Sequence, residues 1–270
     1  MKKKKLGALA AVAMCAVLGL SGLAGCASSE SSASASASTS SSAQTKTLEG
    51  KTLNIYCGAG MTDPFQKIAD EFKAQTGCEM VITFANAAQI QTQIKTTEEG
   101  DFFIAGSKEE TKPVEEYVAS STDLVKHIPV LVVPKDNPKN IASLNDLINA
   151  DTILIGDPES TPIGKIAKKA FTDAGIFDAV SDKLTTTTTA PQIAAALARG
   201  EGDAGIVWKE NVKADGATIV ADSGMDSYTK VIPAAQLKSV KDADAATAFL
   251  EFLGSDTAKN IWAEYGYEQA

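Results

Sequence analysis

The sequence predicts an α/β fold, and three observations support this prediction. From Lys51 onward, short apolar segments with strand character alternate with amphipathic helical segments. Several of these strand-like segments lead through a short turn directly into a helix start. The chain has 270 residues, of which 44% are hydrophobic, and this is enough for one large or two modest domains.

The charge of the chain narrows the classes of partner. The formal net charge is −9, and the first 25 residues contain four lysines and no acidic residue, so the remainder is more acidic still. A surface of this sign disfavours nucleic acid and anionic lipid as the main partner. An anionic ligand would have to be held by local dipoles and hydrogen bonds, because the overall field opposes it.

The N-terminus has the form of a secretory signal peptide. Lys2–Lys5 are basic, and an apolar run from Leu6 to Leu20 follows. The next residues, Leu23-Ala24-Gly25-Cys26, resemble the bacterial lipobox, in which the cysteine becomes the lipidated first residue of the mature chain. We therefore predict a lipoprotein signal peptide over residues 1–25 and lipidation at Cys26. The alternative is an uncleaved membrane helix.

The segment after Cys26 is rich in serine and alanine and cannot bury a core. Residues 26–48 are therefore predicted to form a flexible tether. Together with the lipobox, this predicts a protein that lies outside the cytoplasm and is anchored to the cell membrane only through its N-terminal lipid.

The first half of the globular part is predicted to contain three strands and three helices. Gly77 is expected to end the first of these helices. Asn86 begins the turn into the second, which carries Ile90 and Ile94. The predicted elements, in order, are strand Thr52–Cys57, helix Asp63–Thr76, strand Glu79–Ala85, a helix after Asn86, strand Asp101–Ala105 and a short helix over Lys112–Tyr117.

The second half continues the alternation and ends in two helices. The predicted elements are strand Ile128–Val133, helix Ser143–Ala150, strand Thr152–Ile155, helix Lys165–Ala174, a strand within Lys183–Thr189, helix Ala190–Arg199, strands Ala204–Trp208, Ala217–Asp222 and Tyr228–Leu237, and helices Asp242–Leu253 and Asp256–Tyr265.

One design recurs where predicted strands lead into helices. In Leu53–Phe65 a strand is followed by Gly58 and Gly60, which permit a tight turn, and by Thr62, which we expect to be the helix N-cap. Similar turns occur near Asn86, Thr161-Pro162 and Thr189-Ala190-Pro191. Strand ends of this kind share one sheet edge, and helix N-termini there bind anions. The pattern predicts an oxyanion receptor, with ordinary helix capping as the alternative.

Several segments match a known family in order and spacing. The chain resembles the molybdate-binding periplasmic proteins of ABC importers, a branch of the type II solute-binding proteins, from about Leu48 to the C-terminus. The segments that carry this resemblance are GAGMTDPFQKIADEF, FANAAQIQTQI, DFFIAGS, LVVPK, IGDPESTPIGKIAKKA, GIVW and AFLEFLGSDTAKNIWAEYGY.

The resemblance implies a two-lobed periplasmic-binding-protein (type II) fold with a ligand cleft between the lobes. Lobe 1 would comprise residues 49–127 and 232–270, and lobe 2 residues 128–231. The hinge strands would lie near His127–Pro129 and Val231–Pro233. The implied function is to bind molybdate or tungstate as a monomer and to deliver it to permease and ATPase subunits, without enzymatic activity and without a cofactor.

The resemblance also places the ligand contacts, residue by residue. The two serine positions of the family fall on Gly60 and Ala87, and its tyrosine position falls on Trp208. The lost serine hydroxyls would be replaced by the Thr62 hydroxyl and the Asn86 amide, and the indole N–H of Trp208 keeps one donor. The expected oxyanion-binding set is Gly60, Met61, Thr62, Asn86, Ala87, Ala88, Ile163, Ala190 and Trp208. The two lost hydroxyls leave another anion or a small polar solute as an alternative ligand.

An extracellular α/β enzyme is the remaining alternative, and the sequence lacks its signals. His127, the only histidine, has no Gly-x-Ser-x-Gly elbow to serve and is interpreted as a hinge or surface residue. The segment around Gly164-Lys165 departs from a phosphate-binding loop, because Glu159 stands where the first glycine is required and Ile166 follows the lysine.

Two further groups of residues receive structural interpretations. Asp157 is expected to shape a turn rather than to form a metal site with Glu159. Cys57 would end one strand and Cys78 would precede the next parallel strand, so they are expected at opposite ends of the sheet and without a disulfide.

Overall fold

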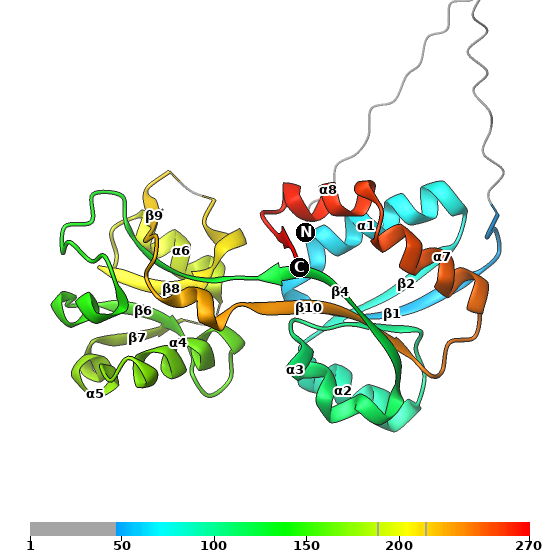
Figure 1. Ribbon diagram of the computed structural model, residues 1–270, viewed down its shortest axis with the longest axis horizontal. Helices are drawn as coiled ribbons and strands as arrows, with labels where there is room; N and C mark the ends of the chain where they lie inside the picture. The colour runs from blue at the N-terminus through cyan, green and yellow to red at the C-terminus, as the bar shows by residue number, and fades with distance from the viewer. Residues whose placement is uncertain (1–46, 188, 214) are drawn as a thin grey trace, which may run out of the picture. The chain divides into compact units, whose positions relative to one another are not determined.

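The computed structural model describes residues 47–187, 189–213 and 215–270, and the described residues belong to one compact unit (Figure 1). The predicted signal peptide, the predicted lipidation site Cys26 and most of the predicted tether lie outside the described residues. Across the described ranges, every helix is too short or too polar to cross a membrane.

The first of two sheets has six strands in the order β11-β4-β10-β3-β1-β2. One half of the sheet is parallel, because β1 (Thr52–Gly58) pairs with both β2 (Glu79–Ala85) and β3 (Phe102–Ile104) in the same direction. Parallel strands need a long connection, and helices α1 (Thr62–Thr76) and α2 (Ala87–Thr97) provide it here.

Antiparallel strands complete this sheet on the other side of β3. β10 (Lys230–Leu237) pairs with β3 and with β4 (Val118–His127), and β11 (Glu268–Gln269) pairs with β4. β4 was not among the predicted strands. Residues 119–123 are polar or small and exposed, so the segment lacks the apolar alternation by which strands are predicted.

The second sheet has five strands in the order β7-β6-β8-β5-β9. β6 is parallel to β7 and β8, whereas β5 runs antiparallel to β8 and β9. The strands are β5 (Pro129–Pro134), β6 (Ile153–Gly156), β7 (Leu184–Thr187), β8 (Ala204–Trp208) and β9 (Ala217–Ile219). The helices between them include α4 (Pro162–Asp173), α5 (Phe177–Val180) and α6 (Ala190–Ala198).

The remaining elements are mostly short. They are η1 (Ala59–Met61), α3 (Lys108–Thr111), η2 (Lys112–Tyr117), η3 (Leu144–Asn149), η4 (Ser181–Lys183), η5 (Lys209–Asn211), η6 (Met225–Tyr228), α7 (Ala243–Leu253) and α8 (Asp256–Glu264). The segment Ser143–Ala150, predicted as an α-helix, forms the 3-10 helix η3. The Ser143 hydroxyl donates to the Asp146 carboxylate and does not cap the helix backbone.

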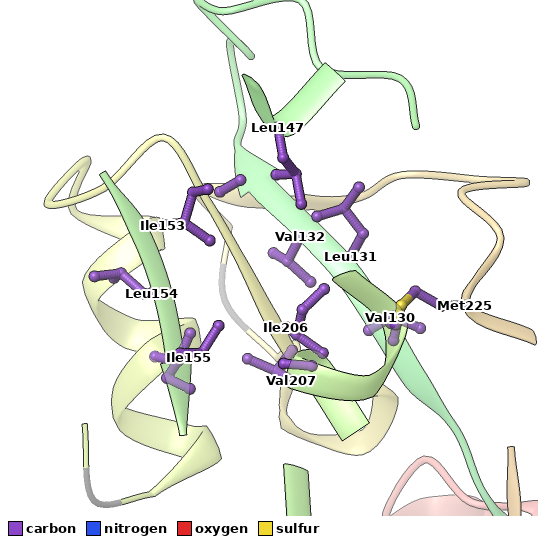
Figure 2. Packing of buried hydrophobic residues seen from close by; sticks show 14 of the residues in the cluster. Val130, Leu131, Val132, Leu147, Ile153, Leu154, Ile155, Ile206, Val207 and Met225 are labelled. Atoms are coloured by element: carbon purple, nitrogen blue, oxygen red, sulfur yellow. The ribbon is translucent and has the colours of Figure 1, made fainter. Parts of the chain in front are cut away.

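Each sheet has its own hydrophobic core, and we call the two sheets with their helices lobe 1 and lobe 2. Successive side chains of a strand point to opposite faces of its sheet. In lobe 1, Ile55 therefore packs in one hydrophobic cluster with Phe249, and the next residue, Tyr56, packs in another with Ile90. In lobe 2, Figure 2 shows one cluster formed across three strands by Val130, Leu131, Val132, Ile153, Leu154, Ile155, Ile206 and Val207. The residue boundaries of the lobes stay a prediction.

Strand register shows where the two lobes meet. Ala234 in β10 pairs with Ile104, the last residue of β3. Lys230, the first residue of β10, pairs with His127, the last residue of β4. The chain then enters β5, whose first residue Pro129 pairs with Trp208, the last residue of β8. The carboxyl ends of the parallel strands of both lobes therefore lie toward the crossover made by β4 and β10, which run side by side in Figure 1. Open α/β sheets bind ligands at this edge.

Several helix ends follow the sequence signals, but the hydroxyls of Ser143 and Thr189 do not cap the backbone, and Thr62 is not at a cap position. Gly77 ends α1 in the left-handed conformation, with φ 80°. Asn86 is the N-cap of α2 in a complete capping box. The prediction that Thr62 is an N-cap was wrong: η1 precedes α1 directly, Met61 occupies the cap position, and Thr62 is the first helical residue.

Candidate functional site

The turn after β1 offers backbone rather than side-chain donors. The Thr62 hydroxyl donates to the Ala59 carbonyl at 2.8 Å, so its proton is already used. The Met61 side chain is buried, and only its backbone could reach a ligand. Gly60 is exposed, and no heavy atom lies within 4 Å of the position that a Cβ would take there. Of the two predicted replacements for lost serine hydroxyls, Thr62 would have to break an existing bond.

The start of α2 presents two unpaired N–H groups. The Asn86 side chain accepts from the Gln89 N–H at 3.0 Å, and the Gln89 side chain accepts from the Asn86 N–H at 3.3 Å. Ala87 and Ala88 come next, and their N–H groups have no hydrogen-bond partner among the described residues. The first N–H groups of a helix have no partner within the helix and lie at the positive end of its dipole.

The helix starts of lobe 2 repeat this arrangement. At α4, Thr161 accepts from the Gly164 N–H at 3.1 Å and donates to the Asp157 carbonyl at 2.8 Å, which confirms it as a cap. The Ile163 N–H is left without a partner in the described part of the chain, as is the Ala190 N–H at the start of α6.

Trp208 ends β8 and is 9% exposed. Its indole ring stacks on the ring of His127, with 3.5 Å between the ring centroids and 18° between the planes. No described residue accepts a hydrogen bond from its indole N–H. Trp208 therefore supplies a donor beside the crossover between the lobes.

Sequence analysis did not identify Glu110 or Glu210, which shape the charge of this region. Glu110 accepts the Gly106 N–H at 2.8 Å, just beyond the end of β3. Burial raises the pKa of Glu110, while the charges of His127 and Lys165 oppose this rise. Glu210 bonds to His127 at 2.9 Å and is 8% exposed at its side chain. Both glutamates lie in single-turn helices, α3 and η5, and no local sequence signal marks such a role there.

Register brings the predicted site residues together in two pairs of turns. Gly58↔Ala85 places the turn after β1 beside Asn86–Ala88, and Gly156↔Thr187 places the start of α4 beside that of α6. The interpretation of Asp157 as a turn residue is confirmed, since its carboxylate accepts from the Glu159 N–H at 2.8 Å. Among the residues that the structure describes, no cluster of three or more metal-ligating side chains occurs. Cys57 and Cys78 are free, as expected, and both are buried.

The fold agrees with the comparison with known proteins. Residues 53–268 match the family described as bacterial extracellular solute-binding protein, and the chain belongs to this family. The two-lobed α/β architecture is that of the type II periplasmic binding proteins.

Individual relatives cover most of this chain. The molybdate-binding protein ModA of Escherichia coli is 28% identical over 81% of this chain and 89% of its own. YvgL of Bacillus subtilis, named as an ABC transporter substrate-binding lipoprotein, is 27% identical over 80% of this chain and 86% of its own. A solved structure from Clostridium difficile, assigned as the substrate-binding domain of a putative molybdenum ABC transporter, is 28% identical in sequence and superposes with a TM-score of 0.70. The match covers 81% of this chain and 99% of the Clostridium difficile chain.

Proposed function

We propose that this protein is the extracytoplasmic substrate-binding component of an ABC importer, and that it binds molybdate or tungstate between its lobes. The observation that carries this proposal is the set of unpaired backbone N–H groups at the helix starts, namely those of Ala87, Ala88, Ile163 and Ala190. Such groups hold anions without a counter-charge. The relatives named for molybdate or molybdenum support the choice of oxyanion.

The distribution of donors suits a tetrahedral dianion. Two pairs of helix starts, one in each lobe, supply N–H groups at the sheet edges that lie toward the crossover. The indole N–H of Trp208 adds a donor from lobe 2. Hydrogen bonds to a charged group contribute about 1.5–3 kcal/mol each, so a few of them can offset the unfavourable overall charge. We propose no enzymatic role.

A titration of ligand-free protein tests this function. The protein would be unfolded, dialysed and refolded to remove carried-over ligand, and then titrated with molybdate, tungstate, sulfate and phosphate by calorimetry. Molybdate and tungstate should bind and raise the melting temperature, because ligand at 100 times its Kd stabilises the native state by about 2.7 kcal/mol. Sulfate and phosphate should leave it unchanged. No response to any of the four anions would refute the proposal.

Trp208→Phe tests the indole donor. Loss of a hydrogen bond to a charged ligand should weaken molybdate binding by roughly tenfold or more. Trp262→Phe is the matched control, because Trp262 is 1% exposed in the core of lobe 1 and its indole nitrogen has no hydrogen-bond partner among the described residues. Equal affinity for molybdate in wild type and in Trp208→Phe would remove Trp208 from the site.

A different solute in the same transport role is the second candidate. Gly60 and Ala87 stand where the family resemblance expects serine hydroxyls, and this change favours a ligand with other hydrogen-bonding needs. Mass spectrometry of protein purified without unfolding would identify the ligand that accompanies it. An organic anion or a neutral solute in place of molybdenum or tungsten would establish this second candidate.

We further propose that the mature protein is monomeric and held at the membrane by a lipid on Cys26. The lipobox-like segment that ends in Cys26 supports the lipid anchor, and so does the naming of YvgL as a lipoprotein. The mass of the purified wild-type protein should correspond to a chain that begins at Cys26 with added acyl groups, and Cys26→Ala should lack the acyl mass. A wild-type protein that retains residues 1–25 and carries no acyl group would indicate an uncleaved membrane helix instead.

A further inference from the structure

His127 occupies the last position of β4, where the chain leaves lobe 1. Its side chain is 12% exposed, and both ring nitrogens face oxygen atoms. Nδ1 lies 3.3 Å from the carbonyl oxygen of Gly106 in lobe 1, and Nε2 lies 2.9 Å from Oε1 of Glu210 in lobe 2. The ring therefore bridges the two lobes at the hinge.

Glu210, which holds the lobe 2 side of this bridge, is itself fixed. Tyr267, which follows α8 in lobe 1, lies near Glu210, and burial together with this carboxylate raises the pKa of Tyr267. The other charged groups near His127 are Glu110 and, on the paired strand β10, Lys230. With contacts from both lobes, the imidazole has little freedom to rotate.

We infer that His127 is a positioning residue that fixes the Trp208 indole for ligand binding. The imidazole lies almost parallel to the indole at 3.5 Å, so it blocks one face of Trp208 and restricts its rotation. The only hydrogen-bond acceptor expected for the Trp208 indole N–H is the ligand. No described residue accepts from this N–H and so fixes its direction. This inference rests on the proposed function, because it takes Trp208 to be a ligand contact.

The bridge also ties the indole to the arrangement of the lobes. His127 is bonded to Gly106 and Glu210 at once, so a change in the distance between the lobes would displace the ring on which Trp208 stacks. Two other side-chain contacts join the lobes: an ion pair between Lys209, the neighbour of Trp208 in the chain, and Glu268, and Lys213 over the ring of Tyr265 at 5.5 Å. They provide controls for the loss of an interlobe contact as such.

The first test needs no ligand. The near-ultraviolet circular dichroism of Trp208 is obtained as the difference between a given protein and the same protein with Trp208→Phe. This difference should be large in wild type, strongly reduced in His127→Ala, and unchanged in Lys213→Ala. His127→Phe should restore it, because a phenyl ring can stack on the indole without forming either hydrogen bond. A Trp208 signal that survives in His127→Ala would overturn the inference, whatever the protein binds.

The second test measures affinity for sodium molybdate in the same variants by calorimetry. Because an aromatic pair contributes the equivalent of about two- to tenfold in an equilibrium constant, His127→Ala should weaken binding by that factor. His127→Phe should recover at least half of the loss in free energy, and Lys213→Ala should bind like wild type. An equal loss in Lys213→Ala would overturn the inference, since it would assign the effect to interlobe contact in general.

A third variant keeps the test decisive if His127→Phe does not fold. His127→Gln retains a donor toward Glu210 but has no aromatic face. It should therefore lose the Trp208 signal and the affinity for molybdate to the same extent as His127→Ala. Wild-type affinity in His127→Gln would overturn the inference, because it would assign the effect to the hydrogen bond with Glu210 and not to the stacking.

The inference and the proposed function can fail separately. A wild-type protein that shows the Trp208 signal and its loss in His127→Ala, but binds no oxyanion, would refute the proposed function and leave the stacking intact. A protein that binds molybdate equally well in wild type and in His127→Ala would refute the positioning role and leave the proposed function standing.

Discussion

Returning hydroxyl groups to the turn after β1 and to the start of α2 should tighten molybdate binding. At Gly60 the side chain would enter open space, and the backbone there does not have a positive φ. At Ala87 a serine would occupy the first position of α2, beside the two unpaired N–H groups. A hydrogen bond to a charged ligand contributes about 1.5–3 kcal/mol, and ordering a short side chain costs about 0.5–1 kcal/mol of this. Each serine should therefore contribute about 1–2 kcal/mol, or roughly a 5- to 30-fold lower Kd.

Calorimetric titration with molybdate measures this gain for Gly60→Ser, Ala87→Ser and the double variant. Gly60→Ala is the matched control, because it adds the same Cβ and stiffens the backbone without supplying a donor. If both turns face the ligand, the two single gains should add within about 0.5 kcal/mol. Folded serine variants that bind molybdate no better than wild type and Gly60→Ala would show that these turns do not contact the ligand.

Three further predictions concern stability. Burial raises the pKa of Glu110, so the contribution of this residue to folding stability is present below the ordinary glutamate pKa and is lost as pH rises through the pKa of the folded state. Glu110→Gln should therefore raise the melting temperature at pH 7 and have little effect on it near pH 4. Gly164→Ala should destabilise lobe 2 by about 1–3 kcal/mol in urea unfolding, because the new Cβ would lie 2.3 Å from the Gly156 carbonyl oxygen. Gly254→Ala is the control, because no atom lies closer than 3.5 Å to its new Cβ. Asn86→Ala should cost about 0.5–2 kcal/mol through loss of the capping box, with Asn86→Ser retaining most of the stability in the same urea assay.

The fold was predictable where local signals and tertiary structure agree. β2 and β8 have the predicted bounds, and α1 ends at Gly77 as expected. β4 was missed because its exposed polar residues are stabilised by pairing with β10, which is distant in sequence and leaves no local signature on β4. Non-local pairing of this kind overrides weak local propensity.

In the candidate site, two helix caps were predictable from the sequence, and the contacts at the crossover were not. Asn86 and Thr161 cap their helices because side-chain capping depends only on neighbouring residues. Thr62 looked equally suitable, but the preceding turn tightened into η1 and moved the cap back to Met61. The contact of His127 with Glu210 joins segments 83 positions apart, so no spacing rule could reveal it.

The departures from the family pattern have a common physical consequence. Where side-chain hydroxyls are absent, at Gly60 and Ala87, the available donors belong to the backbone, which is already ordered in the folded protein and loses no rotamer freedom on binding. The absence of those hydroxyls therefore costs less affinity than the number of lost donors suggests. Backbone donors cannot adjust their reach, however, so discrimination between anions of different size would depend on the side-chain donors, the Asn86 amide and the Trp208 indole. If Trp208 contacts the ligand as proposed, its stacking on His127 would contribute to selectivity as well as to affinity.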